Sequence, residues 1–121
     1  MDISFNDKKT YLFVSCTGKW EPSAVSETLK SIRDHATQLS RNLILVDWRG
    51  VEKPESEFYR YLAGQDVAEI LKPFKTAALY PKELRTKFTE NTAVNRGARF
   101  LVFSDEESAL DWLLDRNLKI E

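Results

Sequence analysis

Apolar residues follow two alternating patterns along the chain, one typical of β-strands and one typical of α-helices. Short, nearly continuous apolar runs predict four strands, at residues 11–16, 43–46, 76–80 and 99–103. Between these runs, apolar residues recur every three or four positions, which is the spacing of one helix face. The clearest stripe of this kind contains Val25, Leu29, Ile32, Ala36 and Leu39. The chain therefore alternates strands with amphipathic helices.

Turn residues predict how the first strands are connected. Residues 6–9 form a polar turn, so residues 3–5 and 10–17 are expected to pair as an N-terminal hairpin. Residues 48–55 contain a Gly and a Pro and are expected to form a loop after the third strand.

Three helices are predicted after the one that carries the apolar stripe. The first covers residues 56–71, with a kink or break expected at Gly64. The second covers residues 82–96 and is closed by Gly97. The last follows a capping box at residues 104–107.

This order of elements predicts the fold class. Strands that alternate with helices are joined by right-handed crossovers, which makes the sheet mostly parallel. The N-terminal hairpin makes the same sheet mixed. We therefore predict a single α/β domain over residues 1–121, with about five strands and about four helices.

Composition and charge exclude several classes of protein. The chain is 42% hydrophobic and 31% charged, which is typical of a folded domain rather than a disordered one. Its 18 basic and 19 acidic residues balance, so nucleic acid is not an expected partner. No apolar run exceeds four residues, so we expect no integral membrane segment, and the absence of a signal-peptide pattern favours a cytoplasmic protein.

Residues with catalytic or metal-binding chemistry are scarce. One Cys and one His cannot build a common zinc site, and we expect no metal and no cofactor. Cys16 is interpreted as a small buried hydrophobe, and His35 lies at the edge of its helix stripe. Phosphate-binding loops, nucleophile elbows and zinc-protease motifs are absent from the sequence. A phospho-receiver domain is excluded because the turn after the first parallel strand lacks an acidic pair. We therefore expect a protein that is not an enzyme.

Two amides stand out on the helix predicted at residues 82–96. The stripe through Leu84 and Phe88 continues through Asn91 and Asn95, which places polar groups on a face expected to be buried. Buried amides need hydrogen-bond partners. Either they hold neighbouring backbone in place, or they line a ligand crevice; we expect Asn95 to be structural and Asn91 to be the better candidate for a site.

A second group of candidates follows a predicted strand. Asp47, Trp48 and Arg49 come directly after the buried run at 43–46, and ligands gather at the carboxyl ends of parallel strands. Trp48 would give an apolar wall, and Arg49 would bind an anion. Arg96, next to Asn95, completes the candidate ligand-binding set.

Two longer stretches resemble a known family. Residues 87–97 read KFTENTAVNRG and residues 103–113 read FSDEESALDWL. Together with residues 43–47 and 64–68, they are similar to small bacterial SpoIIAA-like proteins of the STAS/CRAL-TRIO-like group. The similarity runs from about Tyr11 to Leu114. It implies a β-α superhelix with a mainly parallel sheet, in a subgroup of uncharacterised function.

The resemblance implies two kinds of activity. Anti-sigma-factor antagonists in this group bind proteins under the control of a phosphorylated Ser in an Asp-Ser-Ser-Gly-like turn. Here residues 54–57 read Pro-Glu-Ser-Glu, and the acidic neighbours of Ser56 would repel a phosphate. Phosphorylation of Ser56 is therefore disfavoured, and a helix N-cap is its expected role. Lipid-carrying relatives instead hold a lipophilic ligand in an apolar groove.

These observations lead to two functional hypotheses. The first is a non-enzymatic regulatory or protein-binding module, with a protein partner or a second copy in a homodimer. The alternative is a small carrier or sensor that binds a lipophilic or anionic ligand near the carboxyl ends of the strands. A continuous cavity of drug-like volume lined by Trp48 and by Phe or Leu side chains would favour the carrier, whereas a filled core with an exposed apolar patch would favour the interaction module.

Overall fold

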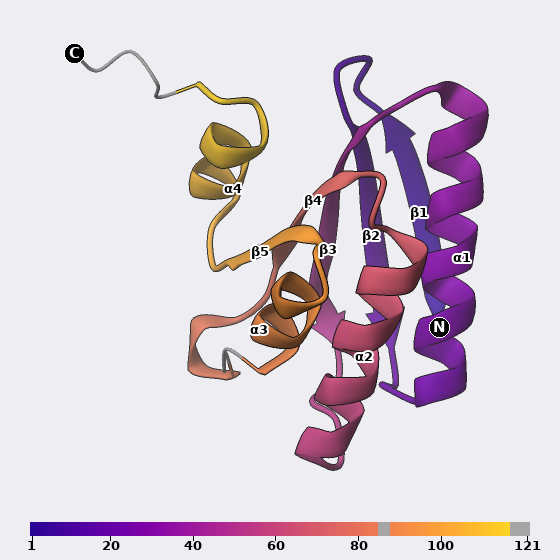
Figure 1. Cartoon of the computed structure of the whole chain (residues 1–121), viewed down its shortest axis with the longest axis vertical. Helices are drawn as coiled ribbons and strands as arrows, with labels where there is room; N and C mark the ends of the chain where they lie inside the picture. The colour runs from indigo at the N-terminus through magenta and orange to yellow at the C-terminus, as the bar shows by residue number, and fades with distance from the viewer. Residues whose placement is uncertain (85–87, 117–121) are drawn as a thin grey trace.

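A five-stranded sheet with four α-helices packed against it forms the fold (Figure 1). The computed structural model describes residues 1–84 and 88–116. The strands are β1 (Asp2–Asp7), β2 (Leu12–Gly18), β3 (Leu43–Val51), β4 (Lys75–Leu79) and β5 (Arg99–Phe103). The helices are α1 (Pro22–Leu39), α2 (Glu57–Ile70), α3 (Phe88–Asn95) and α4 (Glu106–Leu113), with a 3₁₀ turn η1 at Lys82–Leu84.

The sheet topology confirms the predicted fold class. The strands lie side by side in the order β1-β2-β3-β4-β5. Strands β1 and β2 pair antiparallel as the predicted N-terminal hairpin, and every later pair is parallel. The result is a mixed, mostly parallel sheet with the expected numbers of strands and helices.

The two faces of the sheet carry separate cores. Helices α1, α2 and α3 cover one face and contribute to the larger core, whereas α4 covers the other face with a smaller one (Figure 1). The predicted stripe of α1 is confirmed, because its residues are buried or packed against the larger core. Cys16 is fully buried there, and half-buried His35 stacks on Phe5 with ring centroids 4.0 Å apart.

Strand β3 is longer than predicted. Residues 48–51 were expected to begin a loop, yet they continue the strand beside β2, where Thr17 pairs with Gly50 and Gly18 with Val51. The register shifts between Ser15 and Thr17, which marks a bulge in this ladder. The bulge lets β3 follow β2 to its end, and pairing with β2 overrides the local loop signal.

Helix α2 is continuous, so the predicted break at Gly64 is wrong. A Cβ at Gly64 would lie 2.6 Å from the Cβ of Thr92 and 2.8 Å from the carbonyl oxygen of Thr89. Glycine is therefore needed for the close approach of α3 to α2.

The helix predicted at residues 82–96 is wrong at its start, residues 82–84. The 3₁₀ turn η1 ends at Leu84, residues 85–87 lie outside the described residues, and α3 covers only Phe88–Asn95. Its predicted end is confirmed, since Gly97 follows with a φ of +95°. In α4, the N-cap is Asp105, whose carboxylate accepts a hydrogen bond from the backbone N–H of Ser108 at 2.8 Å.

Candidate functional site

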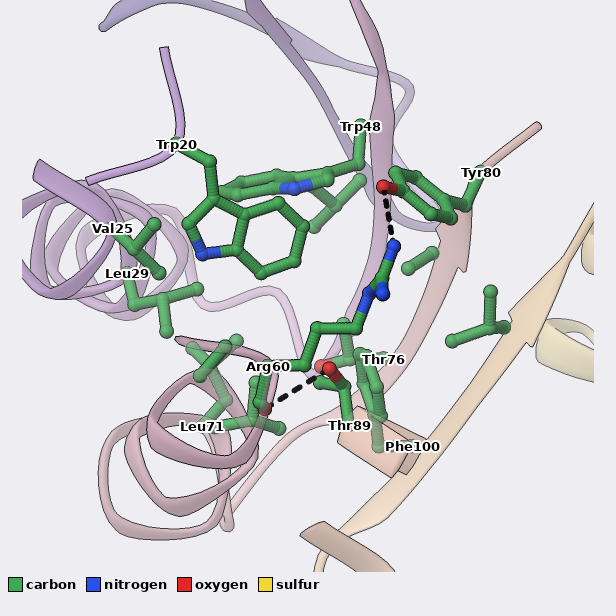
Figure 2. Close-up of a pocket in the computed structure, with 15 residues that line it drawn as sticks. Trp20, Val25, Leu29, Trp48, Arg60, Leu71, Thr76, Tyr80, Thr89 and Phe100 are labelled. Carbon is green, nitrogen blue, oxygen red and sulfur yellow. Dashed lines mark hydrogen bonds between the residues drawn. The ribbon is translucent and has the colours of Figure 1, made fainter. Parts of the chain in front are cut away.

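An apolar cavity of about 80 Å³ lies between the sheet and helices α1, α2 and α3 (Figure 2). Figure 2 shows Arg60 reaching from α2 toward Tyr80, with Trp20 and Trp48 on one side. The lining residues are Trp20, Val25, Leu29, Val46, Trp48, Arg60, Ala63, Val67, Leu71, Thr76, Ala78, Tyr80, Thr89, Phe100 and Val102. Tyr80 directly follows β4, so part of this wall lies at the carboxyl end of that strand.

The alternation of side chains along the strands builds one wall of the cavity. Every second residue of a strand points to the same face, which brings Val46 and Trp48 of β3 next to Thr76 and Ala78 of β4. The small side chains of β4 leave space opposite α2. Large aromatic side chains close that space at one end.

Three buried polar atoms of this wall have no hydrogen-bond partner among the residues that the structure describes. They are Nε1 of Trp20, Nε1 of Trp48 and Oγ1 of Thr76. The two indoles meet edge to face with their ring centroids 5.7 Å apart (Figure 2). Leaving such an atom buried and unpaired costs about 1–3 kcal/mol. All three atoms belong to residues that line the same cavity, where water or another small molecule could satisfy them.

Arg60 gives the cavity its charge. Its side chain is only 6% exposed, and it forms an ion pair with Glu57, whose side chain is 52% exposed. The guanidinium also donates hydrogen bonds to Tyr80 Oη at 3.3 Å and to the carbonyl oxygen of Leu84 at 3.2 Å. Its central carbon lies 6.0 Å from the ring centroid of Trp20 and 5.8 Å from that of Tyr80. Cation–π contacts and hydrogen bonds thus hold a buried cation at the cavity wall.

Strand β3 places the side chain of Trp48 on one face of the sheet and those of Asp47 and Arg49 on the other. Trp48 lines the cavity, but Asp47 and Arg49 do not. They form an ion pair with each other at 2.9 Å, and hydrogen bonds from Arg49 lower the pKa of the Asp47 carboxyl. Because β3 continues through these residues, neighbours point to opposite faces of the sheet. The three side chains therefore do not converge on this cavity, and a ligand-binding role for Asp47 and Arg49 stays a prediction.

The predicted amides lie on the surface. Asn91 and Asn95 are exposed, whereas α3 buries Glu90, Thr92 and Ala93. The 3₁₀ turn η1 ends at Leu84, so that residue does not belong to the same helical stripe as the amides. Neither amide lines the cavity, and their expected burial is wrong. A role for them in ligand binding stays a prediction.

Arg96 lies apart from the cavity as well. Its exposed guanidinium donates a hydrogen bond to Tyr61 Oη at 3.2 Å and lies 6.0 Å from the centroid of that ring. Ser56 occupies the predicted N-cap position of α2, although its side chain makes no capping hydrogen bond. Trp48 is thus the one residue of the predicted ligand-binding set that lines the cavity.

Sequence reasoning missed Trp20, Arg60 and Thr76 as site residues. A signal existed for Arg60, because the buried residues Ala63 and Val67 follow it at helical spacing. A charged residue on an apolar stripe points to a paired or functional group. Thr76 gave no comparable signal, since threonine is common in strands.

Metal binding and thiol chemistry find little support in the described part of the chain. No group of three or more His, Cys, Asp or Glu residues within it could hold a metal ion. Burial raises the pKa of the Cys16 thiol to about 12, so the thiol stays protonated at neutral pH. Across residues 1–84 and 88–116, no helix combines the length and the apolar character that crossing a bilayer requires.

Comparison with known proteins identifies the fold. No family model and no curated protein matches the sequence. Among solved structures, the chain is similar to an uncharacterized protein of the DUF3478 family from Shewanella loihica PV-4, which has a SpoIIAA-like fold. The two share 21% sequence identity with a TM-score of 0.59, over 93% of this chain and 92% of the other. This chain therefore has a SpoIIAA-like fold.

Proposed function

We propose that this chain is a small-molecule-binding domain, a sensor or carrier, whose ligand occupies the cavity beside Trp20 and Trp48. One observation carries the proposal: three buried polar atoms without protein partners line the same apolar cavity. Binding pockets typically combine mostly apolar walls with a few convergent polar groups. The position near the carboxyl ends of parallel strands also agrees with where ligands bind in α/β folds.

The size of the cavity limits the ligand. Pockets for drug-sized molecules enclose roughly 300–1,000 Å³, whereas this cavity measures about 80 Å³. The drug-like volume expected of a carrier is therefore not present in this cavity. A long lipid chain would require α2 or the aromatic side chains to move. The cavity as it stands suits a ligand of a few non-hydrogen atoms.

The lining favours binding over catalysis. In the part of the chain that the structure describes, its ionisable side chains are Arg60 and Tyr80, and these are hydrogen-bonded to each other. The buried Cys16 thiol, with its raised pKa, is a poor nucleophile. We therefore propose a protein that is not an enzyme.

Indole resonances provide the experiment. A ¹H–¹⁵N spectrum resolves the Nε1–H groups of the three tryptophans. Trp20 and Trp48 line the cavity, whereas Trp112 packs against Phe103 on the other face of the sheet and serves as an internal control. In a titration with a panel of small acids, amides, alcohols and amines, at least one compound should shift the first two resonances and leave the third unchanged. No selective shift with any compound would refute the proposal.

A second candidate is a protein-binding module. Phe58 on the first turn of α2 is 60% exposed, and its ring stacks on Tyr61 with centroids 5.9 Å apart. An exposed aromatic side chain that stacks on half-buried Tyr61 favours a contact surface. Sedimentation equilibrium of the wild type and of Phe58→Ser tests self-association. A monomer in both cases would argue against a homodimer through this surface.

A further inference from the structure

We propose that the cavity selects a small carboxylic acid with a short apolar body. This inference rests on the proposed function and adds the chemical class of the ligand. It is drawn from the kind of polar atom left unpaired, from the charge at the wall and from the size of the cavity.

The unpaired polar groups call for an acceptor. An indole N–H donates a hydrogen bond and cannot accept one. Two of the three unpaired atoms are indole nitrogens, and the third is the hydroxyl of Thr76, which can also donate. A ligand that brings oxygen acceptors would satisfy whichever of these groups it reaches, whereas a donor such as an ammonium would leave both indoles unpaired.

The charge at the wall favours an anion. Among the described residues, Arg60 is the charged residue of the lining, and no Asp or Glu lines the cavity. The carboxylate of Glu57, which pairs with this guanidinium, is half exposed, so solvent weakens the attraction between the two charges. A carboxylate near the guanidinium would be attracted in a medium of low dielectric constant. A cationic ligand would instead meet a second buried positive charge.

The remaining surface suits a short hydrocarbon. Val25 and Leu29 of α1 and Val67 and Leu71 at α2 surround the rest of the cavity with apolar groups. The cavity measures about 80 Å³, far below the roughly 300–1,000 Å³ of pockets for drug-sized molecules. Acids of about three to five carbons therefore match the space better than long-chain fatty acids.

Three probes of equal chain length test the ligand class. Butyrate, butyramide and butylammonium are titrated into the full chain at pH 7 and constant ionic strength, and the indole resonances of Trp20 and Trp48 are followed. We expect butyrate to bind at least about fivefold more tightly than butyramide, because a hydrogen bond to a charged group is the stronger one. Butylammonium should leave both resonances unchanged.

The outcomes separate this inference from the proposed function. If butyramide or butylammonium binds as tightly as butyrate, or if only neutral compounds of the wider panel bind, the cavity is a ligand site but the carboxylate inference is overturned. If no compound shifts the two indoles selectively, the proposed function fails as well.

A charge-removing variant gives a second test. Glu57→Gln removes the counter-charge of Arg60 and should tighten butyrate binding about threefold, the size expected for a partly exposed ion pair. Glu55→Gln is the matched control, because Glu55 is an exposed residue of the same charge two positions away. Equal effects of the two variants on butyrate binding would overturn a direct role of Arg60. Both variants change exposed carboxylates, and thermal unfolding verifies that each is folded.

Discussion

Replacing Thr76 by valine tests whether its buried hydroxyl lacks a partner in the ligand-free protein. Thr76 is 1% exposed in β4, and its Oγ1 faces neither solvent nor a described acceptor. Valine has nearly the same shape and the same β-branched preference for strands. The substitution therefore exchanges the hydroxyl for a methyl group and changes little else.

Thr76→Val should raise the free energy of unfolding because it removes a buried hydroxyl that lost its water on folding. A buried hydroxyl without a partner costs about 1–3 kcal/mol, and a buried methyl group contributes about 0.8 kcal/mol. Water that enters the cavity would hydrogen-bond to the hydroxyl and so reduce the stability gained by removing it. We expect Thr76→Val to raise the free energy of unfolding by about 1–2 kcal/mol, which corresponds to an increase in Tm of roughly 3–8 °C.

Urea denaturation of the ligand-free protein measures the effect, with an unchanged m-value as evidence of the same folded surface. Thr89→Val is the matched control in the same cavity. The hydroxyl of Thr89 donates a hydrogen bond to the carbonyl oxygen of Arg60 at 3.0 Å, so its loss should lower the free energy of unfolding by about 1 kcal/mol. If Thr76→Val destabilises the protein as much as Thr89→Val does, the Thr76 hydroxyl is already satisfied and the reasoning is refuted.

Three further predictions concern packing, reactivity and pH. Gly64→Ala should lower the free energy of unfolding by about 2 kcal/mol in urea denaturation, because the new methyl would lie 2.6 Å from Thr92; an unchanged midpoint would contradict this. Cys16 should not react with a thiol reagent at pH 8 until the protein unfolds, since burial raises its pKa to about 12; rapid labelling of the native protein would contradict this. Asp47→Asn should be less stable than the wild type at pH 7, and the difference should shrink as the pH falls below 3.8, because Arg49 lowers the pKa of folded Asp47 below that value. A difference that stays constant from pH 7 to pH 2 would show that the ion pair contributes nothing through its charge.

The sequence predicts the architecture well because its hydrophobic pattern is strong. Apolar runs at residues 43–46 and 76–80 identify buried parallel strands, and the stripe of α1 predicts which of its faces is buried. The errors lie where tertiary contacts override local signals. Pairing with β2 extends β3 through a predicted loop. The glycine that had indicated a break in α2 is instead needed for the close packing of α3 against α2.

The site could be predicted only in part. Trp48 was found because it follows a buried strand, but its neighbours Asp47 and Arg49 lie on the opposite face once β3 continues. Trp20 and Arg60 reach the cavity from separate elements. No local sequence pattern predicts that these two side chains lie close together. Such a site depends on contacts between distant segments, which the order of residues does not reveal.

The most direct test of the central claim is a high-resolution crystal structure of the protein soaked with butyrate. The account predicts electron density for the acid inside the cavity, with carboxylate oxygens within hydrogen-bond distance of Trp20 Nε1, Trp48 Nε1 or Thr76 Oγ1, at about 2.7–3.2 Å. A cavity that is closed by rearranged side chains, or that holds only ordered water at saturating butyrate, would contradict it.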